Sequence, residues 1–498
     1  MIRPTAAKTS IAPVPSGGAL PQVLALEPVP DVLAALRAVA GLPHVVLLDS
    51  ALVREPVGRY SFLAADPFAW HLVPQARYGM DHFAPLRMAL RDMSSAPVPG
   101  LPPFQGGVAG LLGYGLGAAW ERLPRARFDE FQIPDMAVGI YDWVLAWDHL
   151  AGQAWLISQG FPERDMAARR SRARQRLEWV AQRLASADSR QPAPPPHSSA
   201  LAGPALAGRM LERSELAPQF PVRGLPELTS NFSAEGYLQA VGRAIEYIRA
   251  GDVFQVNLSQ RLLYPYSGQA VELYARLRAC NPAPFAGLLF GEDWAVVSAS
   301  PERLVSLRDQ CVEARPIKGT RRRGHGPEAD LYTRDELRES EKDQAENIMI
   351  ADLLRNDLSR VCEPGSIRVP ALCQVETYET VQHLVSVVQG RLRAGGGPWD
   401  LLPAVFPGGS ISGAPKVRAV QIIAELEPTA RGAYCGSLAY VGFDGALDSN
   451  LLIRTFTLRH GWAQCPVGGG VVAQSSPEAE YEETWHKAAG MLRALEPQ

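Results

Sequence analysis

The chain has 498 residues, of which 47% are hydrophobic and 20% are charged. This composition excludes a wholly disordered or fibrous chain. The formal net charge of -3 lacks the basic excess of a general nucleic-acid binder. No apolar run reaches the roughly 18 residues that a membrane span needs. Met1 to Leu20 lack the apolar core of a secretory signal, and the six cysteines form no CxxC pair, so we expect a reduced, cytoplasmic enzyme.

One segment differs sharply in composition from the rest. Residues 187–208 read ADSRQPAPPPHSSALAGPALAG. A stretch so rich in Pro, Ala and Ser cannot bury enough apolar surface to fold alone. We therefore expect a linker over 187–219, between an N-terminal region at 20–186 and a C-terminal region at 220–495.

Periodicity predicts elements along both regions. Short apolar runs bounded by breakers predict strands, and apolar residues at helical spacing predict helices. In chain order, strands are expected at His44–Ser50 and Ala154–Ser158, a helix at Arg164–Arg183, a helix at Ser233–Ala250, strands at Val256–Tyr264 and Trp294–Ser298, and helices at Glu339–Leu358, Val417–Leu426 and Glu478–Leu495.

The helix expected near residues 340–358 has acidic residues on its apolar side. Asp343 and Glu346 fall on the same side as Ile350, Leu353 and Asp357. A solvated acidic face would lie opposite the apolar stripe. These carboxylates should therefore point inward, where each needs a cation, a donor or a proton.

The last helix carries a second acidic stripe. Glu480, Glu483 and Lys487 lie about 120° from the apolar face that contains Tyr481 and Trp485. Taken alone, this stripe is more typical of a solvated surface than of a site. The alternative is that the two acidic stripes converge on a hard divalent cation such as Mg²⁺, which prefers oxygen ligands.

The basic run RPIKGTRRR at 315–323 contains a lysine between an apolar residue and a glycine. Most such runs are solvated or contact anions. Neighbouring cations and burial would both favour the neutral amine of Lys318. A neutral lysine is a nucleophile, so Lys318 is a candidate for covalent chemistry if it is buried.

Two glycine-rich loops are candidate binding elements. Phe406 to Lys416 reads FPGGSISGAPK before a helix, which fits either an anion site at the helix N-terminus or a plain capping loop. Gly468 to Gly470 would let a ligand approach the backbone closely. The sequence contains no phosphate-binding GxxxxGK[ST], no HExxH and no nucleophilic cysteine motif of an amidotransferase.

Nine stretches in order resemble the chorismate-utilising enzymes, a family that includes anthranilate, aminodeoxychorismate, isochorismate and salicylate synthases. They are GDVFQVNLSQR (251–261), SASPERL (298–304), RPIKGTRRRG (315–324), AENIMIADLLRNDLSRV (345–361), VQHLVSVVQG (381–390), FPGGSISGAPKVRAV (406–420), RGAYCGSLAYVG (431–442), IRTF (453–456) and EYEETWHKAAGML (480–492). Weaker similarity covers LLDSALVREPVGRYSFLAADP (47–67).

Two positions distinguish members of the family. Gln255 stands where the water-using isochorismate and salicylate synthases carry a basic lysine. Lys318 stands in PIKGT, where anthranilate synthases usually have alanine. The resemblance is therefore closest to component I of aminodeoxychorismate synthase, which makes 4-amino-4-deoxychorismate for p-aminobenzoate and folate; anthranilate synthase component I, which makes anthranilate and pyruvate, is the alternative.

The resemblance also implies site roles. Lys318 is the expected nucleophile and Glu302 the general acid. The expected Mg²⁺ ligands or water-holders are Glu346, Glu483, Asp343 and Glu480. The expected substrate-binding residues are Gln255, Thr320, His383, Ser410, Tyr434, Arg454, Gly468, Gly470 and Lys487.

Fold and partners follow from the same resemblance. It implies an α+β architecture of two large, mostly antiparallel sheets packed face to face, with helices outside. Ammonia is expected from a separate glutamine amidotransferase subunit. The LLDSA stretch (47–51) is similar to the tryptophan-binding stretch of anthranilate synthase, so tryptophan is a candidate ligand there.

Overall fold

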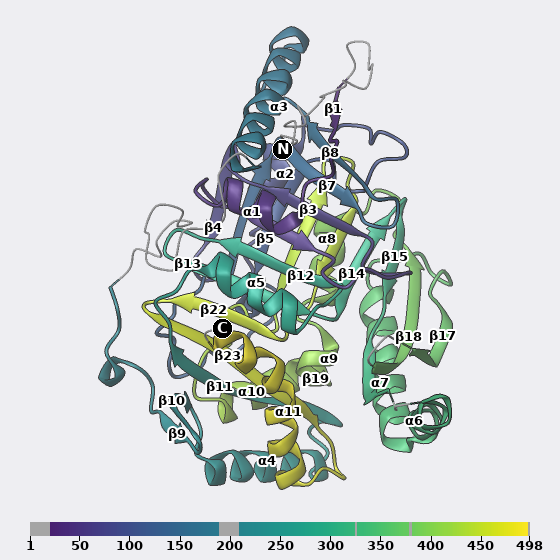
Figure 1. Ribbon diagram of the computed structural model, residues 1–498. Helices are drawn as coiled ribbons and strands as arrows, with labels where there is room; N and C mark the ends of the chain where they lie inside the picture. Colours follow the sequence, from purple (N-terminus) through teal and green to yellow (C-terminus); the bar gives the residue numbers. More distant parts are fainter. Residues whose placement is uncertain (1–19, 189–208, 324–325, 378–380, 497–498) are drawn as a thin grey trace.

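The computed structural model describes residues 20–188, 209–323, 326–377 and 381–496 (Figure 1). The central part of the predicted linker, 189–208, lies outside these residues, as does the N-terminal stretch before residue 20. No helix in the described ranges is long and apolar enough to cross a membrane.

Two large sheets organise the described chain, and all pairings between their named strands are antiparallel. The first sheet has the order β1-β8-β7-β3-β2-β12-β13-β22-β23-β11-β10-β9, with β19 beside β11. Its strands are β1 (Gln22–Ala25), β2 (Val46–Asp49), β3 (Tyr60–Ala64), β7 (Trp143–Asp148), β8 (Gln153–Ser158), β9 (Phe220–Val222), β10 (Leu225–Ser230), β11 (Gln255–Pro265), β12 (Phe285–Phe290), β13 (Trp294–Ser300), β19 (Gly413–Ala414), β22 (Thr455–Arg459) and β23 (Trp462–Val471).

The second sheet has the order β16-β18-β15-β14-β21-β20-β5-β6-β4, with β17 beside β18. Its strands are β4 (Ala69–Val73), β5 (Gly107–Leu112), β6 (Met136–Tyr141), β14 (Arg303–Arg308), β15 (Cys311–Ala314), β16 (Ile317–Arg322), β17 (Arg368–Thr377), β18 (Val381–Arg391), β20 (Ser437–Gly442) and β21 (Leu447–Asn450). Both sheets therefore combine strands from either side of the linker, as where β2 pairs with β12 and β5 with β20.

Helices cover the outer faces of the sheets (Figure 1). They are α1 (Val32–Val39), α2 (Ala84–Leu90), α3 (Met166–Asp188), α4 (Ala234–Arg249), α5 (Ala270–Cys280), α6 (Pro327–Glu339), α7 (Glu341–Ser359), α8 (Pro398–Val405), α9 (Gly409–Ser412), α10 (Lys416–Leu426) and α11 (Pro477–Leu495). Short 3-10 turns occupy Tyr114–Ala119 and Arg213–Glu215.

The nine predicted elements match this structure, with shifts at their ends. The helix predicted at Glu339–Leu358 is the clearest difference, because α6 ends at Glu339 and α7 begins at Glu341. Ser340 is the N-cap of α7, and its hydroxyl accepts a hydrogen bond from the Asp343 amide at 3.3 Å. Such a cap satisfies a free amide of the first turn and fixes where the helix begins.

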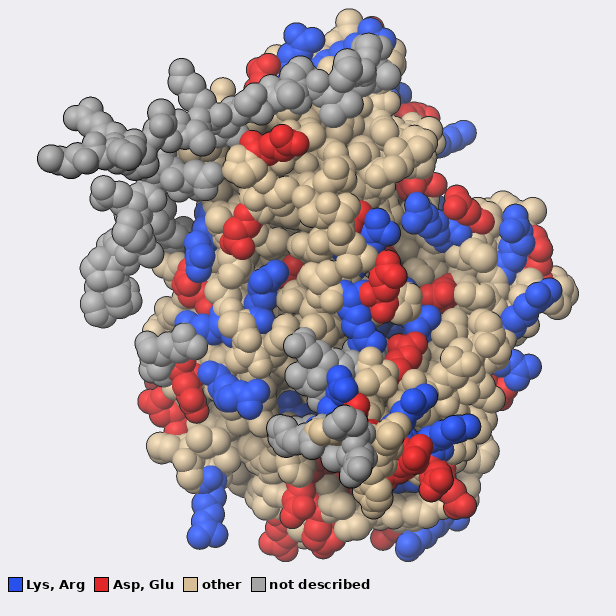
Figure 2. Space-filling model, turned by 45° about the vertical axis from the view of Figure 1, so that its right-hand side comes forward, with Lys and Arg blue, Asp and Glu red and all other residues tan. Residues whose placement is uncertain are grey.

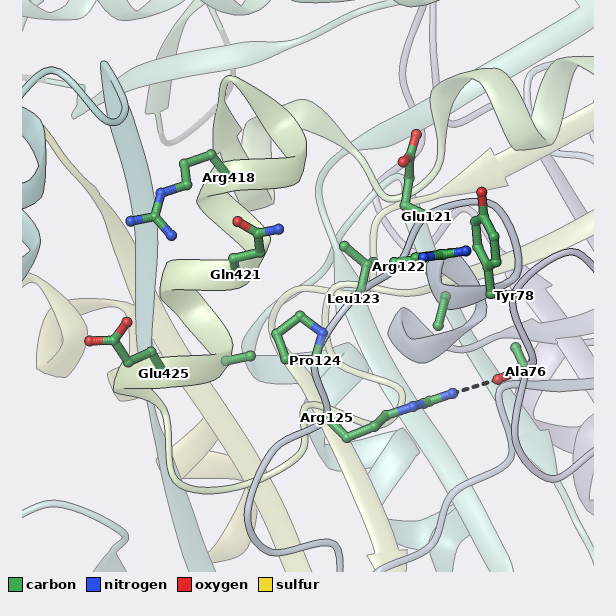
Figure 3. A pocket seen from close by; sticks show the side chains of 12 residues that line it. Ala76, Tyr78, Glu121, Arg122, Leu123, Pro124, Arg125, Arg418, Gln421 and Glu425 are labelled. Atoms are coloured by element: carbon green, nitrogen blue, oxygen red, sulfur yellow. Dashed lines mark hydrogen bonds between the residues drawn. The ribbon is translucent and has the colours of Figure 1, made fainter.

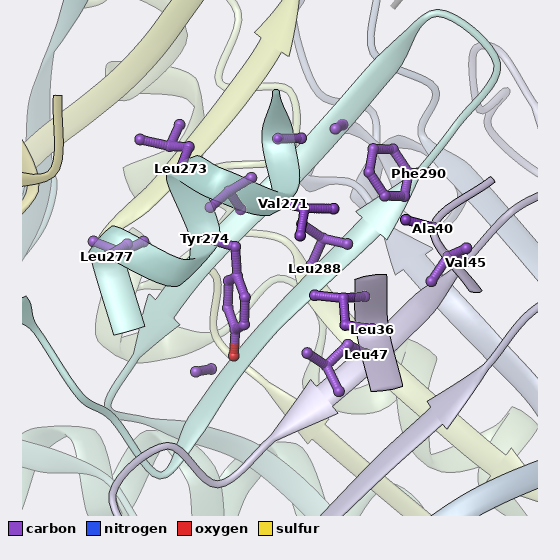
Figure 4. Packing of buried hydrophobic residues seen from close by; sticks show 14 of the residues in the cluster. Leu36, Ala40, Val45, Leu47, Val271, Leu273, Tyr274, Leu277, Leu288 and Phe290 are labelled. Carbon is purple, nitrogen blue, oxygen red and sulfur yellow. The ribbon is translucent and has the colours of Figure 1, made fainter. Parts of the chain in front are cut away.

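The core lies in layers. Between the sheets, Phe62 of β3 packs against Tyr440 of β20, with ring centroids 5.6 Å apart. On the outer face of the first sheet, α1 and α5 place Leu36 and Tyr274 over Leu288 of β12 (Figure 4). On the outer face of the second sheet, α7 and α8 cover β14 and β18. This layering confirms the predicted α+β fold of two facing sheets with helices outside.

The surface mixes both signs of charge. Figure 2 shows acidic and basic side chains interspersed over the visible face, without a broad area of one sign. This distribution agrees with the nearly balanced totals of 49 basic and 52 acidic residues.

Candidate functional site

A bulge in β16 sets the position of Lys318. Lys318 pairs with Leu384 and Thr320 pairs with the adjacent His383, so Gly319 is an extra residue in the strand. Gly319 has φ +69, and a Cβ there would lie 2.9 Å from Cγ of Asp343. Only glycine accepts both the left-handed backbone and this close approach. The bulge therefore brings β16 tightly against the first turn of α7. The side chain of Thr320 lies outside the described part of the chain.

The Lys318 amine lies in a partly enclosed site. Its Nζ is 3.9 Å from Oε2 of Glu346 and 3.4 Å from the carbonyl oxygen of Ser410. Its side chain is only 14% exposed, so the amine does not stand in bulk solvent. Three segments that are distant in sequence, β16, α7 and the loop at 406–416, therefore meet at this nitrogen.

The crowding of Lys318 by cations stays a prediction, because the side chain of Arg322 lies outside the described part of the chain. Alternate residues of a strand point to opposite faces, and acidic partners take up the neighbouring arginines. Arg321 pairs with Asp343 at 3.0 Å and with Glu336 at 2.9 Å. Further salt bridges join Arg323 to Asp330 and Arg315 to Glu376. The ion pair that Lys318 makes among the described residues is with the Glu346 carboxylate.

Glu302 is a buried acid beside this lysine. Only 6% of the residue is exposed, and its Oε1 accepts a hydrogen bond of 2.9 Å from the Ser410 hydroxyl. Burial raises the pKa of Glu302 to about 6, although Lys318, Ser410 and the Ile317 amide oppose the shift. A carboxyl group with this pKa can hold and release a proton near neutral pH.

The acidic residues of α7 point inward, as their position on the apolar stripe predicts. Burial raises the pKa of Glu346, with Lys318 and Lys342 opposing the shift and Asp343 and Glu480 adding to it. Farther along the helix, burial also raises the pKa of Asp357, whose carboxylate pairs with Lys416 at 2.7 Å. The charge of Glu480 on α11 therefore contributes to the raised pKa of Glu346 on α7.

The second acidic stripe, on α11, is only partly solvated. Glu480 is 3% exposed, and burial raises its pKa; its Oε1 accepts a hydrogen bond from Ser475 at 2.7 Å. Its Oε2 is buried and has no hydrogen-bond partner in the described chain. Glu483 is closer to the surface: burial would raise its pKa, but Lys487, 2.6 Å away, outweighs burial and lowers it. Lys487 also donates to the Gly468 carbonyl at 2.9 Å.

A lysine that the motifs did not single out connects the two acidic helices. Nζ of Lys342, in the first turn of α7, lies 3.6 Å from Oε1 of Glu480 on α11. A Cβ placed on Gly469 would lie 3.0 Å from Oε2 of Glu480 and 3.5 Å from Oε1 of Glu483. The backbone of β23 therefore lies directly against both glutamates, and the side of the site opposite Lys318 is formed by α11 and β23.

The described residues form no preassembled metal cage. No group of three acidic, histidine or cysteine side chains there is arranged as a metal site, because lysines stand beside the glutamates. The donor set nevertheless fits a divalent cation: Glu346, Glu480 and Glu483 supply oxygens, and Oε2 of Glu480 is buried without a partner. Mg²⁺ is bound through a few carboxylates while it keeps water or substrate oxygens.

Gln255 is a second group without partners. It is fully buried in β11, and neither its Oε1 nor its Nε2 has a hydrogen-bond partner within the described ranges. The amide lies over Gly470, where a Cβ would come within 2.0 Å of Nε2. Buried amides normally have partners, so Gln255 and the glycine next to it fit a place where a ligand or water binds.

The charge of Arg454 acts on both His383 and the buried acid Glu302. Burial lowers the pKa of His383 to about 4, and the charges of Arg454 and Arg54 lower it further, so its imidazole is neutral at pH 7. Burial lowers the pKa of Arg454, with Glu302 opposing the shift. Arg454 has a positive φ of 52, and the described chain offers its guanidinium no hydrogen bond or ion pair. A guanidinium without a partner among the described residues is suited to a carboxylate ligand.

Tyr434 is fully buried, and burial raises the pKa of its hydroxyl well above the ordinary value. The Arg431 guanidinium lies 5.7 Å from the centre of its ring.

Two further residues near the site were not predicted from the sequence. Arg431 joins the loop at 406–416 to β11 by donating to the carbonyls of Ile411 and Asn257. The buried amide of Asn347 donates to the Leu384 carbonyl at 3.1 Å and so ties α7 to β18.

The LLDSA stretch at 47–51, which is similar to a tryptophan-binding stretch, has hydrogen-bond partners within the protein. Asp49 accepts hydrogen bonds from Ser61 at 2.6 Å, from Tyr274 at 2.6 Å and from Arg278 at 2.7 Å. The Ser50 hydroxyl donates to the Tyr60 carbonyl at 2.6 Å. Binding of tryptophan here stays a prediction.

A surface cavity of about 870 Å³ lies elsewhere, between α10 and the segment at 118–125 (Figure 3). None of the predicted site residues lines it. Several of its charged groups are engaged by the protein itself: Arg125 donates to the Ala76 carbonyl, and Arg418 pairs with Asp252. The cavity therefore does not share the unpaired groups found around Lys318.

Comparison with known proteins shows which family the chain matches. The family model described as chorismate binding enzyme matches residues 60–493. The chain belongs to the chorismate-binding enzyme family. It is therefore a chorismate-utilising enzyme, which confirms the family that the sequence motifs indicated.

Curated relatives in this family carry two different names. The chain is 41% identical over 414 residues to aminodeoxychorismate synthase component 1 of Klebsiella aerogenes, covering 82% of this chain and 81% of the relative. It is 42% identical over 415 residues to anthranilate synthase component 1 of Thermus thermophilus, covering 83% and 82%. Anthranilate synthase component I of Streptococcus pneumoniae has the same fold, with TM-score 0.70, 30% identity and coverage of 88% and 93%.

Proposed function

We propose that the chain is component I of aminodeoxychorismate synthase, which converts chorismate and ammonia into 4-amino-4-deoxychorismate. The observation that carries this proposal is the amine of Lys318. It is mostly enclosed, 3.9 Å from Glu346, and its charge influences the pKa of the buried acid Glu302. Relatives of both names are equally similar overall. Lys318, which stands where anthranilate synthases usually have alanine, supports the first of the two functions.

Mg²⁺ would be held by Glu346 and Glu483, with Glu480 and Asp343 as further ligands or holders of its water. Asp343 fits the outer role better, because Arg321 already engages its carboxylate at 3.0 Å. When bound, the ion supplies the positive charge that anchors the ring carboxylate of chorismate. The orphaned oxygen of Glu480 supports a ligand at this end of the site.

The first chemical half uses Lys318 and Glu302. The neutral amine of Lys318 forms a bond to ring carbon two, both ring double bonds shift by one position, and the hydroxyl at ring carbon four leaves with the electrons of its bond. Glu302 gives that hydroxyl a proton, so it departs as water. With a pKa of about 6, roughly a tenth of the Glu302 population carries the required proton at pH 7.

The second half uses ammonia. Its nitrogen bonds to ring carbon four, both ring double bonds shift back, and the bond between ring carbon two and Lys318 breaks, which releases the neutral lysine. The new ammonium group then returns a proton to Glu302. No cysteine motif for glutamine hydrolysis occurs in the sequence, so we propose that a separate glutamine amidotransferase subunit supplies the ammonia.

The remaining predicted residues would hold the substrate. Arg454, whose guanidinium has no partner among the described residues, would bind the enolpyruvyl carboxylate in a charge-assisted contact. Neutral His383 and the Ser410 hydroxyl would position the ring and its leaving hydroxyl. The others proposed to line the substrate are Gln255, Thr320, Tyr434, Lys487 and the backbone of Gly468 and Gly470.

The reaction product tests this proposal. The purified chain is incubated with chorismate, MgCl₂ and ammonium chloride at pH 8.5, and the products are separated by chromatography. We expect aminodeoxychorismate, which added lyase converts to p-aminobenzoate. Fluorescent anthranilate together with pyruvate would instead establish the alternative, anthranilate synthase component I. A reaction with EDTA in place of MgCl₂ is the control and should yield neither product.

A further inference from the structure

Each of the three glutamates proposed to hold Mg²⁺ faces its own lysine. Two of the three contacts are longer than an ordinary hydrogen bond. The pairs are Glu346 with Lys318 at 3.9 Å, Glu480 with Lys342 at 3.6 Å, and Glu483 with Lys487 at 2.6 Å. Two of these lysines have proposed roles with the substrate, whereas Lys342 has none.

The use of lysine at these positions is unusual for this chain. The sequence contains only five lysines but 44 arginines, and three of the five stand beside these glutamates. Other buried acids are held by arginine, as Glu427 is by Arg431 and Asp49 by Arg278, with Asp357 and Lys416 as an exception. Arginine forks hold a carboxylate in two places, whereas the lysine ammonium is a single point charge on a flexible stem. A carboxylate paired with lysine is therefore easier to transfer to another cation.

Lys342 also stands where local structure disfavours a cation. It lies in the first turn of α7, whose other charged residues are acidic, because the helix dipole places positive charge at that end. Its side chain is 49% exposed, while its partner Glu480 is almost fully buried. The lysine can therefore swing into solvent, but the carboxylate cannot. Oε2 of Glu480 remains without a partner even while Lys342 contacts Oε1.

We propose that Lys342 is a tethered counter-ion of Glu480 that a divalent cation displaces. In the metal-free enzyme the ammonium group neutralises the buried carboxylate. When the cation binds, Lys342 turns outward and Glu480 joins the ion's shell directly or through water. This inference rests on the proposed function only in assuming that a divalent cation binds here. Its consequence is that Lys342 competes with the cation and weakens its binding.

Calorimetric titration of the full chain with MgCl₂, without substrate, measures this competition. We expect Lys342→Met to bind Mg²⁺ about two- to fivefold more tightly, the range that an exposed ion pair supports. Lys342→Arg should bind it no more tightly than wild type, because a fork holds Glu480 at least as firmly. The matched control is Arg355→Met on the same helix, whose partner Asp352 is solvent-exposed; it should leave the affinity unchanged.

Thermal unfolding gives a second readout that needs no activity. A ligand that binds only the folded state raises Tm, and at a given concentration it raises Tm more when it binds more tightly. Adding MgCl₂ should therefore raise Tm more for Lys342→Met than for wild type or Arg355→Met, and the melts in EDTA verify that each variant folds. Equal or weaker Mg²⁺ binding by Lys342→Met than by wild type would overturn this inference but not the proposed function. Wild-type enzyme that binds no Mg²⁺ would overturn it too, while the product assay separately decides the reaction.

Discussion

Two groups of charged residues in the C-terminal half of the chain are built in opposite ways. Arg431 and Glu427 are at most 4% exposed, and their side chains contact each other at 2.6 Å and 2.9 Å. Every remaining group has a partner: Arg431 donates to the carbonyls of Ile411 and Asn257, and Glu427 accepts from the amide and hydroxyl of Ser259.

The acidic cluster of α7 and α11 is less completely satisfied. The Lys318–Glu346 and Lys342–Glu480 pairs are separated by 3.9 Å and 3.6 Å. One oxygen of Glu480 has no hydrogen-bond partner in the described residues. A buried charge with all its partners stabilises one conformation, whereas a buried charge with a weak partner retains the capacity to bind a ligand. The first arrangement therefore supports the fold and the second can serve the reaction.

Breaking the Arg431 arrangement should have the largest effect on stability. Arg431→Met leaves Glu427 buried without its counter-charge, so we expect the free energy of unfolding to fall by about 3–5 kcal/mol. Urea denaturation followed by circular dichroism measures the change. The control is the double variant Glu427→Gln/Arg431→Met, which removes both charges and should recover part of the loss. A loss below about 1 kcal/mol in the single variant would contradict a scaffold role.

Neutralising Glu302 in the candidate site should instead increase the stability of the protein. Burial raises the pKa of Glu302 from 4.5 to about 6, so its ionised form is disfavoured in the folded enzyme. The stabilising contribution is complete below pH 4.5 and is lost as the pH rises through about 6. A shift of this size costs about 2 kcal/mol at pH 8. Glu302→Gln removes this cost. The glutamine side chain can keep the hydrogen bonds to the Ser410 hydroxyl and the Ile317 amide, because the Ser410 hydroxyl can accept as well as donate.

We therefore expect Glu302→Gln to be more stable than wild type by about 2 kcal/mol at pH 8 and equally stable at pH 4, while its turnover of chorismate falls. Paired urea titrations at the two pH values measure this difference. Stability that is lower than wild type at pH 8 would show that Glu302 is scaffold, like Glu427. Unchanged turnover would remove its role as the acid.

Much of this comparison could be predicted from the sequence. The shared stripe of Asp343, Glu346 and Ile350 predicts inward-facing carboxylates, because one helix face cannot be both apolar and solvated. The glycines at 468–470 predict that a ligand can approach the backbone closely, which stays a prediction; the structure shows the side chains of Glu480 and Glu483 next to Gly469. The inference about α7 succeeds because it depends on residues within a single element.

What the sequence did not predict depends on contacts between elements. The α11 stripe resembles a solvated face, yet Glu480 is buried because α7 and β23 cover it. The basic run around Lys318 likewise does not reveal that Arg321 pairs with acids on α6 and α7. Lys342 carried one usable signal, the scarcity of lysine in an arginine-rich chain, but its partner is more than a hundred residues away.

Peptide mapping by mass spectrometry tests the central claim, that Lys318 bonds to the substrate, most directly. The enzyme is mixed with chorismate and MgCl₂ without ammonia, quenched in acid and digested. The account predicts a chorismate adduct, less one water, on the peptide that contains Lys318. Ammonia added before the quench should remove this adduct, and Lys318→Ala should show no adduct and at least about a hundredfold slower aminodeoxychorismate formation. Full activity of Lys318→Ala, or an adduct on another residue, would contradict the account.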